Sequence, residues 1–164
     1  MVTSRRGVLG AIGLGAAGLA GCLTSEPSDS DGNPTAERIH ADYETTEVSV
    51  ESSGEELGSV TAAIADTGDL RHTGLSDTAA LPADRGMLFV FETADSRTFV
   101  MREMDFAIDI LYADVDGTIT EIHHAPEPGP NENGNNQEYS GFGQYVLEVN
   151  YDWTADRGIE PGDR

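Results

Sequence analysis

The sequence predicts a single, mainly β domain with short helical pieces, folded as a compact, strongly curved or barrel-like sheet. Its 164 residues, of which 38% are hydrophobic, are enough for one domain with a buried core. Apolar and polar residues alternate along several short segments, which is typical of strands with one buried face. These segments follow one another in a meander-like order, and such an order favours a sheet that curves strongly or closes on itself.

The first half of the domain predicts two strands and a short helix. Residues 43–51 alternate and predict an edge strand, and residues 58–66 form a second alternating segment. Residues 67–77 predict a short helix, because Leu70 and Leu75 are compatible with one apolar side, although two glycines limit its length.

The middle of the domain predicts a series of short strands. Residues 87–91 form a continuous apolar run, which is typical of a buried strand. Residues 97–101 and 107–114 predict two more strands, joined at residues 103–106, where Glu103 and Asp105 are expected to face solvent. The pair Asp116-Gly117 then separates two β-prone runs, which is the strongest short-range signal for a hairpin turn.

The last part of the chain combines a long loop with one more strand. Residues 125–143 predict an irregular segment, and loops longer than about 12–15 residues in compact domains are usually functional or mobile. Residues 144–150 predict a strand with Glu148 on one face and Leu147 on the other. A helical turn that ends at Gly158 closes the domain.

The beginning of the chain predicts an export signal. Residues 4–9 (SRRGVL) resemble the twin-arginine export motif. The uncharged run that follows is shorter than the roughly 20 residues of a membrane-spanning helix. Residues 19–22 (LAGC) resemble a lipobox, in which the thiol of the cysteine receives a lipid. An uncleaved N-terminal anchor with an incidental cysteine is the alternative.

These signals predict the organisation of the whole chain. We expect a signal peptide at residues 1–21, a lipidated Cys22 followed by a disordered acidic tether over residues 22–42, and a globular domain at residues 43–164. The lipid would hold the domain at the outer face of the cytoplasmic membrane.

The charge of the chain is strongly acidic. Nine basic residues, all of them arginine, stand against 30 acidic residues, for a formal net charge of −21. Such a surface repels itself in dilute buffer, whereas at molar salt the screening length falls to about 3 Å. The composition resembles that of extremely halophilic archaea. It excludes a nucleic-acid partner, because so few cations cannot neutralise phosphates.

No motif in the chain predicts a particular reaction, cofactor or metal. The sequence has no nucleophile elbow, phosphate loop or dinucleotide fingerprint. His123 and His124 are adjacent on a predicted strand, so they point to opposite faces and do not share a metal. We therefore expect no cofactor and no metal site.

Two carboxylates stand among aliphatic residues of predicted strands. They are Asp109 and Glu148, and each must find a hydrogen-bond donor or solvent, because an unpaired buried carboxylate is very costly. Arg102 is the natural partner, with Arg71 and Arg85 as the other candidates. Two interpretations stay open: an ion pair that holds strands in register, and a ligand site.

Three segments resemble the domain-of-unknown-function-192 family. They are residues 71–91 (RHTGLSDTAALPADRGMLFVF), residues 99–114 (FVMREMDFAIDILYAD), and residues 145–150 (YVLEVN) with the later residues 157–159 (RGI). The resemblance covers roughly residues 60–164 in the right order. It implies a compact, sheet-rich single domain that is often exported, and it implies no established activity.

The chain departs from the family pattern at residues 99–104. Where the family commonly reads Phe-Trp-Met-Lys-Asn-Thr, this chain reads FVMREM. If the tryptophan and asparagine of the family touch a ligand, that contact is altered here, at Val100 and Glu103.

Two functions from different classes are compatible with the sequence. The first is a tethered binding module, with a small polar ligand such as a sugar or peptide fragment held under the 125–143 segment, or a structural role in the cell envelope. Its candidate ligand-binding residues are Arg71, Met101, Arg102, Asp109 and Glu148. The second is a cell-envelope hydrolase of sugar chains, with Asp109 and Glu148 as an acid/base pair. The absence of a motif around either carboxylate favours the first, and the oligomeric state stays open.

Overall fold

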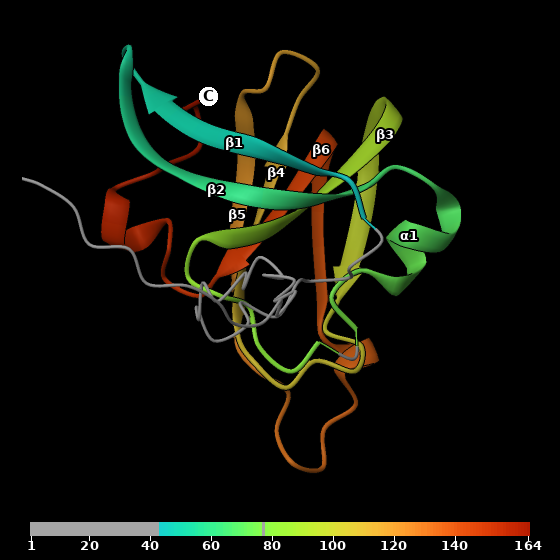
Figure 1. Ribbon diagram of the computed structural model, residues 1–164. Helices are drawn as coiled ribbons and strands as arrows, with labels where there is room; N and C mark the ends of the chain where they lie inside the picture. The colour runs from blue at the N-terminus through green and yellow to red at the C-terminus, as the bar shows by residue number, and fades with distance from the viewer. Residues whose placement is uncertain (1–42, 77) are drawn as a thin grey trace, which may run out of the picture. The chain divides into compact units, whose positions relative to one another are not determined.

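The computed structural model describes residues 43–164 with the exception of Asp77. The predicted signal peptide, the predicted lipid site at Cys22 and the tether at residues 22–42 lie outside the described residues. The described chain forms one six-stranded sheet in the order β1-β2-β3-β6-β4-β5 (Figure 1). The strands are β1 (Thr45–Ser52), β2 (Glu55–Ala65), β3 (Arg85–Val100), β4 (Ile108–Ala113), β5 (Ile119–Ala125) and β6 (Glu138–Asn150).

The helical pieces of this part are short, as the sequence predicts. They are α1 (Gly68–Thr73) and two 3₁₀ turns, η1 (Gly134–Asn136) and η2 (Ala155–Arg157), the last of which ends at Gly158 in the left-handed conformation. Within the described residues, no helix is long and apolar enough to cross a membrane. A mainly β domain with small helical pieces is therefore confirmed.

Two tight turns form the antiparallel pairs β1–β2 and β4–β5. Ser53 and Gly54 link the first pair with φ values of 51° and 85°, the left-handed backbone that two-residue hairpin turns need. In the second, Gly117 has φ of 83°, and its amide donates a hydrogen bond to the carbonyl of Asp114 at 3.1 Å. The hairpin predicted from Asp116-Gly117 is confirmed.

The order of the remaining strands is not a meander. β2 and β3 run parallel, joined by a crossover that contains α1, and β6 inserts between β3 and β4. The predicted strands at residues 87–91 and 97–101 are one long strand, β3, whose register against β6 shifts between Val90 and Asp95. The meander-like order expected from the sequence is wrong, because these pairings join segments far apart in the chain.

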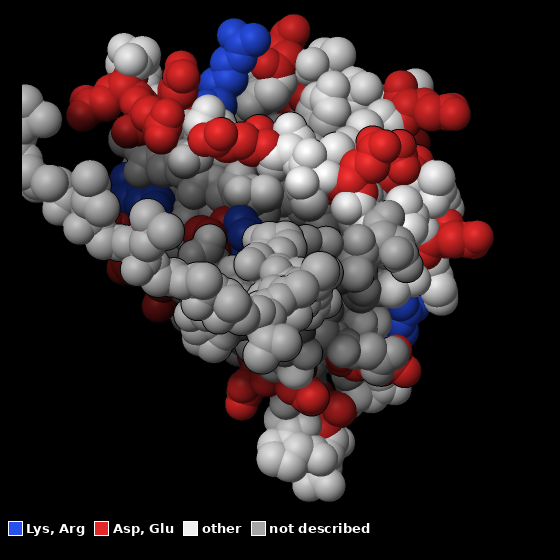
Figure 2. Space-filling model, in the orientation of Figure 1, with Lys and Arg blue, Asp and Glu red and all other residues white. Residues whose placement is uncertain are grey.

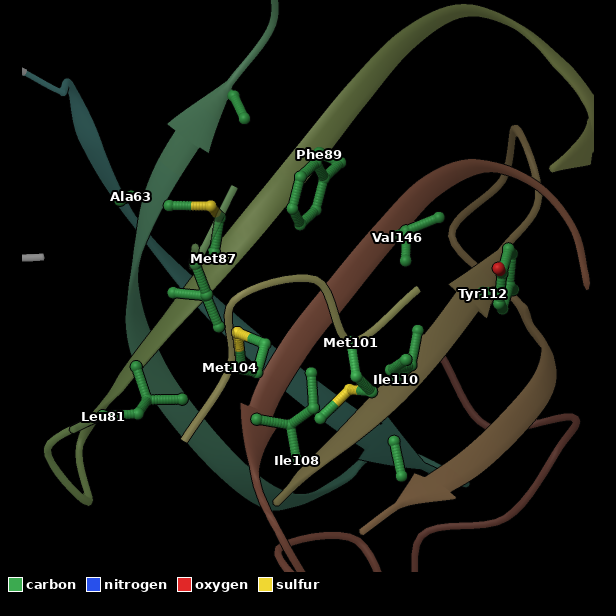
Figure 3. Close-up of a cluster of buried hydrophobic side chains, with 13 residues drawn as sticks. Ala63, Leu81, Met87, Phe89, Met101, Met104, Ile108, Ile110, Tyr112 and Val146 are labelled. Atoms are coloured by element: carbon green, nitrogen blue, oxygen red, sulfur yellow. The ribbon is translucent and has the colours of Figure 1, made fainter. Parts of the chain in front are cut away.

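Buried apolar side chains lie on both faces of the sheet. One face carries a cluster that we call the first core, shown in Figure 3, with Met87, Phe89, Ile108, Ile110, Tyr112 and Val146. The other face carries the second core, with Val60, Ala62, Leu111, Leu147 and Val149. The neighbours Ile110 and Leu111 belong to different cores, because successive side chains of a strand point to opposite faces.

The expectation of a barrel-like sheet is wrong. The described sheet is open, with β1 and β5 as its edges in the strand order. In a small barrel, one face of every strand points into a single interior. Here each face has its own cover: Leu81, Met101 and Met104 pack into the first core, and Trp153 and Ile159 pack into the second.

The last residues of the chain hydrogen-bond to both edge strands. Glu51 of β1 exchanges two backbone hydrogen bonds with Arg164, at 2.6 and 2.9 Å. Ile119 of β5 donates to the carbonyl of Asp163 and accepts from the amide of Gly162, both at 2.8 Å. We call residues 162–164 the C-terminal clip, because they connect β1 to β5 without forming a strand between them.

The predicted irregular segment at residues 125–143 is shorter than expected. Strand β6 begins at Glu138, so residues 138–143 belong to the sheet. The part before β6 is fixed against the turn after β3, where the amide of Met101 donates to the carbonyl of Gly134 at 3.1 Å. A Cβ atom on Gly134 would lie 1.9 Å from the carbonyl oxygen of Met101, so this close approach requires glycine.

Acidic side chains are spread over the described surface. In the view of Figure 2 they occupy many separate places, and basic side chains occupy few. This distribution fits the net charge of −21.

Candidate functional site

The strongest candidate site is a cavity of about 420 Å³ between α1, β3 and the first core. Its walls come from the end of α1 and the residues that follow it, from the middle of β3, and from the turn after β3. Its polar lining side chains include Arg71, His72, Ser76, Arg97, Thr98, Arg102 and Glu148, and its apolar ones include Leu75, Phe89, Phe91, Phe99 and Met104.

The short helix α1 places Arg71 and His72 at the cavity. Its first turn is capped by Thr67, whose hydroxyl accepts a hydrogen bond from the amide of Leu70 at 3.3 Å. It ends at Gly74, whose φ of 51° turns the chain away from the helix. Both basic residues lie in the last turn, where cations interact favourably with the negative end of the helix.

Arg71 is held in place by backbone carbonyls and by an aromatic ring. Its Nη1 donates to the carbonyls of Asp66 at 2.5 Å and Val90 at 2.8 Å. Its guanidinium carbon lies 4.9 Å from the centroid of the Phe91 ring. Among the described residues, no carboxylate forms an ion pair with Arg71.

Arg97 contacts the same ring from β3. Its guanidinium carbon lies 3.5 Å from the Phe91 centroid, which is a close cation–π contact. Its Nη2 donates to the carbonyl of Thr93 at 2.6 Å, and its Nε donates to the carbonyl of Gly143 at 3.3 Å. Within the described part of the chain, Arg97 too has no ion pair with a carboxylate.

Arg102 connects the turn after β3 to the end of α1. Its Nη2 donates to the carbonyl of His72 and to the hydroxyl of Ser76, the latter at 3.1 Å. Its Nε lies 3.9 Å from a carboxylate oxygen of Glu103, a distance at the limit of an ion pair between partly exposed groups. Arg102 therefore fixes one wall of the cavity.

Glu148 lies at the inner end of the cavity. It stands on β6 opposite Met87 of β3 and Ile110 of β4, so its side chain projects into the first core. The residue is 5% exposed, and no described residue donates a hydrogen bond to its carboxyl group. Burial raises the pKa of Glu148 from its usual 4.5 to about 8.

Aromatic rings form the apolar side of the cavity. Phe89 and Phe99 meet edge to face with centroids 4.8 Å apart, and Phe99 meets Tyr112 in the same way at 5.9 Å. Burial and the neighbouring Glu148 carboxyl raise the pKa of Tyr112, whose hydroxyl donates to the carbonyl of Tyr139 at 2.7 Å. Phe89 and Phe99 line the cavity, and Tyr112 packs against Phe99.

The structure brings three of the five sequence-predicted ligand residues together. Arg71, Arg102 and Glu148 line the cavity. Met101 is 1% exposed and packs in the first core behind it. Asp109 lies elsewhere, on the opposite face of the sheet.

Asp109 is fully buried and makes four hydrogen bonds, none of them with Arg102. It accepts from the amide and the hydroxyl of Thr154 at 2.9 and 2.6 Å, from the amide of Asp152 at 3.2 Å, and from Nδ1 of His124 at 2.7 Å. These contacts attach the segment after β6 to β4 and β5. The predicted pairing with Arg102 is wrong, because the two residues belong to opposite sides of the sheet.

Asp109 and Glu148 do not form a catalytic pair across one cleft. Asp109 is opposite Val149 in the β4–β6 register, whereas Glu148 is opposite Ile110. Val149 belongs to the second core and Ile110 to the first. The two carboxyl groups therefore project from opposite faces.

Sequence reasoning did not single out Arg97 and Phe91. Both are separated from Phe89 and Phe99 by an even number of positions. A prediction of one continuous strand from residue 85 to residue 100 would therefore have placed all four side chains on one face. Reading this segment as two separate strands removed that signal.

The site offers cations, hydroxyl groups and one buried carboxyl group beside aromatic rings. Among the described residues, no group of three or more His, Cys, Asp or Glu side chains is arranged to hold a metal ion. The arrangement suits reversible binding of a small molecule with one polar and one apolar end.

The comparisons with known proteins identify a family and two similar structures. The model of the DUF192 family, described as an uncharacterized ACR, matches residues 48–164. A crystal structure from Sinorhizobium meliloti, described as a candidate transcription regulator, is similar with a TM-score of 0.67 and 27% identity, over 74% of this chain and 92% of that one. A protein of unknown function from Novosphingobium aromaticivorans is similar with a TM-score of 0.63 and 26% identity, over 76% of this chain and 86% of the other. No curated protein matches the chain.

Proposed function

The chain belongs to the DUF192 family, and from this premise and the cavity we propose that it is a membrane-tethered binding module for a small polar ligand. The ligand would occupy the cavity between α1 and β3. The domain would lie on the outer face of the cytoplasmic membrane of a halophilic cell, exported by the twin-arginine route and held there by a lipid on Cys22.

The observation that carries the proposal is the carboxyl group of Glu148. It is buried in the first core beside a cavity, and no described group donates a hydrogen bond to it. Its oxygens are not among the buried polar atoms without a partner, which in the described residues are Oε1 of Gln137 and Nε1 of Trp153, so the group opens onto the cavity. A carboxyl group that lines a cavity in this way can hydrogen-bond a ligand, which supports a binding site.

The placement of the two buried carboxyl groups supports binding over hydrolysis. Glycoside hydrolases use two carboxyl groups about 5–9.5 Å apart on either side of one bond. Asp109 and Glu148 face opposite sides of the sheet, and Asp109 is occupied by four hydrogen bonds. A sugar-chain hydrolase with this pair is therefore the weaker proposal.

Gene regulation through nucleic-acid contact is not part of the proposal. The similar protein from Sinorhizobium meliloti is described as a candidate transcription regulator. This chain has a net charge of −21, which opposes contact with a phosphate backbone.

A thermal-unfolding screen tests the binding function. The protein is titrated in molar salt with sugars, short peptides and divalent metal ions. A ligand at 100 times its dissociation constant should stabilise the fold by roughly 2.7 kcal/mol. Ser96→Trp, which places a large ring at the cavity lining, should reduce that effect. If no compound stabilises the protein and calorimetry with small organic anions also shows no binding, the binding function is wrong.

Fractionation of cells tests the tether separately. Cys22→Ser should release the protein into the medium or leave it as uncleaved precursor. A variant that is cleaved and stays in the membrane like the wild type would contradict lipid anchoring at Cys22.

A further inference from the structure

We propose that the ligand of the cavity is a small organic anion, with its oxyanion group between Arg71 and Arg97 and its apolar part against Phe89 and Phe99. The oxyanion is a carboxylate or a phosphate monoester. This inference rests on the proposed function, because it names the class of ligand that the same cavity takes.

Positive charge is concentrated at the cavity. The described residues contain six arginines, and three of them, Arg71, Arg97 and Arg102, line this one cavity. Glu148 is the only acidic side chain among the described residues of its lining. In a protein with a net charge of −21, such a concentration of cations is the reverse of the general surface.

Two of these cations have no counter-charge among the described residues. Both Arg71 and Arg97 lie over the ring of Phe91, at 4.9 and 3.5 Å from its centroid. Their hydrogen-bond partners are backbone carbonyls, and no described carboxylate forms an ion pair with either. Two like charges beside one ring repel each other, and a bound anion would offset that repulsion.

The guanidinium groups of Arg71 and Arg97 keep N–H donors that no described group uses. Arg71 uses only Nη1 for its carbonyl partners, so its Nη2 and Nε remain available. Arg97 uses Nε and one hydrogen of Nη2, so its Nη1 remains available. Guanidinium N–H groups bind carboxylate and phosphate oxygens in pairs, and the carbonyl contacts already fix their orientation.

Glu148, the one acidic group among the described residues of the lining, is held mainly in its neutral form. Burial favours the neutral form of Glu148, so this residue does not cancel the charge of the arginines at neutral pH. As a neutral carboxyl group it can donate a hydrogen bond to a ligand oxygen. The apolar depth of the cavity, with Phe89 and Phe99 edge to face, matches an aromatic or aliphatic group.

The experiment uses the purified full chain at constant molar potassium chloride, with binding measured by calorimetry. The four probes are benzoate, phenyl phosphate, benzyl alcohol and inorganic phosphate. We expect benzoate, phenyl phosphate or both to bind at least tenfold more tightly than benzyl alcohol, which has the ring without the charge. Inorganic phosphate should bind at least tenfold more weakly than the better aromatic anion, because it lacks the apolar part. The aromatic anion that binds more tightly shows whether the cavity prefers a carboxylate or a phosphate monoester.

Arginine variants test the placement of the anion. Arg97→Gln should weaken binding of the better probe at least tenfold, and Arg71→Gln serves the same purpose if the first variant does not fold. Arg157→Gln is the matched control. This arginine also lies over an aromatic ring, 4.8 Å from the Trp153 centroid, but it is not part of the cavity lining. Its loss should leave affinity unchanged.

The outcomes separate this inference from the proposed function. Equal binding of benzyl alcohol and benzoate, or unchanged affinity in Arg97→Gln, overturns the anion assignment while the cavity remains a ligand site. The anion assignment is also overturned if a neutral sugar stabilises the protein in the thermal screen and neither aromatic anion binds. If neither the screen nor the four probes give any binding, both proposals are wrong.

Discussion

Two buried carboxyl groups on neighbouring strands have opposite surroundings in this domain. Asp109 is fully buried and surrounded by donors, so its hydrogen bonds hold the C-terminal segment to the sheet. Glu148 is nearly as buried but has only the cavity and the first core around it. The first carboxyl group contributes to stability, and the second lines the cavity, where the proposed ligand would meet it.

Glu148 should make the stability of the domain fall as the pH rises. In the unfolded chain this carboxyl ionises near its usual pKa of 4.5, whereas in the folded protein burial raises the pKa to about 8. The stability associated with the neutral carboxyl is complete below pH 4.5 and is lost as the pH rises through 8. We expect wild type to lose on the order of a few kcal/mol relative to Glu148→Gln across this window.

Denaturant unfolding of both proteins in molar salt, at several pH values from 5 to 9, measures this difference. Glu148→Gln keeps the shape of the side chain and removes its titration, and the other acidic residues contribute equally to both proteins. Parallel stability profiles for the two proteins would show that Glu148 titrates normally in the fold.

Asp109→Asn should destabilise the fold and leave ligand binding unchanged. An amide supplies one acceptor oxygen in place of two and brings an NH₂ group toward donors, so either the two donors of Thr154 or the donors of Asp152 and His124 lose their acceptor. We expect a loss of about 2–4 kcal/mol in the free energy of unfolding. His124→Asn, which removes one partly exposed partner, should cost less. A loss of affinity without a loss of stability would instead place Asp109 in the binding site.

The sequence was sufficient to identify the buried carboxyl groups but not their partners. Alternation along each strand gives the face of Asp109 and of Glu148 within its own strand. It does not give the register between β4 and β6, because β5 and a loop separate these strands in the chain. That register decides that the two carboxyl groups project from opposite faces of the sheet. Arg97 was missed for a related reason, because its partner Phe91 was assigned to a different strand.

At the level of elements, the segment between β5 and β6 depends on one glycine. Gly134→Ala would place a Cβ atom 1.9 Å from the carbonyl oxygen of Met101, so the segment or the turn after β3 must move. We expect a loss of about 1–3 kcal/mol in the free energy of unfolding, measured with denaturant. Gly129→Ala in the same segment is the control, since its nearest contact would be an ordinary 3.6 Å, and it should change stability by less than about 0.5 kcal/mol. Equal effects would mean that the close approach is not maintained in solution.

Elements governed by local sequence were predictable, and those governed by long-range pairing were not. The Asp116-Gly117 turn, the short helix after β2 and the helical turn ending at Gly158 follow from residues within a few positions of one another. The parallel β2–β3 pair and the insertion of β6 between β3 and β4 join distant segments, and no local pattern specifies them. The continuous apolar run at residues 87–91 did indicate burial on both faces. Met87 and Phe89 pack in the first core and Leu88 packs against the second, as expected for an open sheet that is covered on both sides.

For the whole molecule, the acidic surface predicts a strong dependence of stability on salt. Raising potassium chloride from 0.1 M to 1 M shortens the screening length from about 10 Å to about 3 Å, which weakens repulsion among the carboxylates. We expect the midpoint of thermal unfolding to rise by several degrees over this range, measured by circular dichroism. The rise should be smaller near pH 4, where many carboxylates are neutral. An unchanged or lower midpoint at high salt would contradict adaptation to concentrated salt.

The C-terminal clip also has a consequence for the motions of the domain. Residues 162–164 hydrogen-bond to Glu51 of β1 and to Ile119 of β5, the two strands at opposite ends of the sheet order. A fluctuation that releases the clip frees the amide hydrogens of both residues at once. Their exchange with deuterated solvent should therefore report one shared opening event, although frayed ends of two separate edge strands would exchange independently.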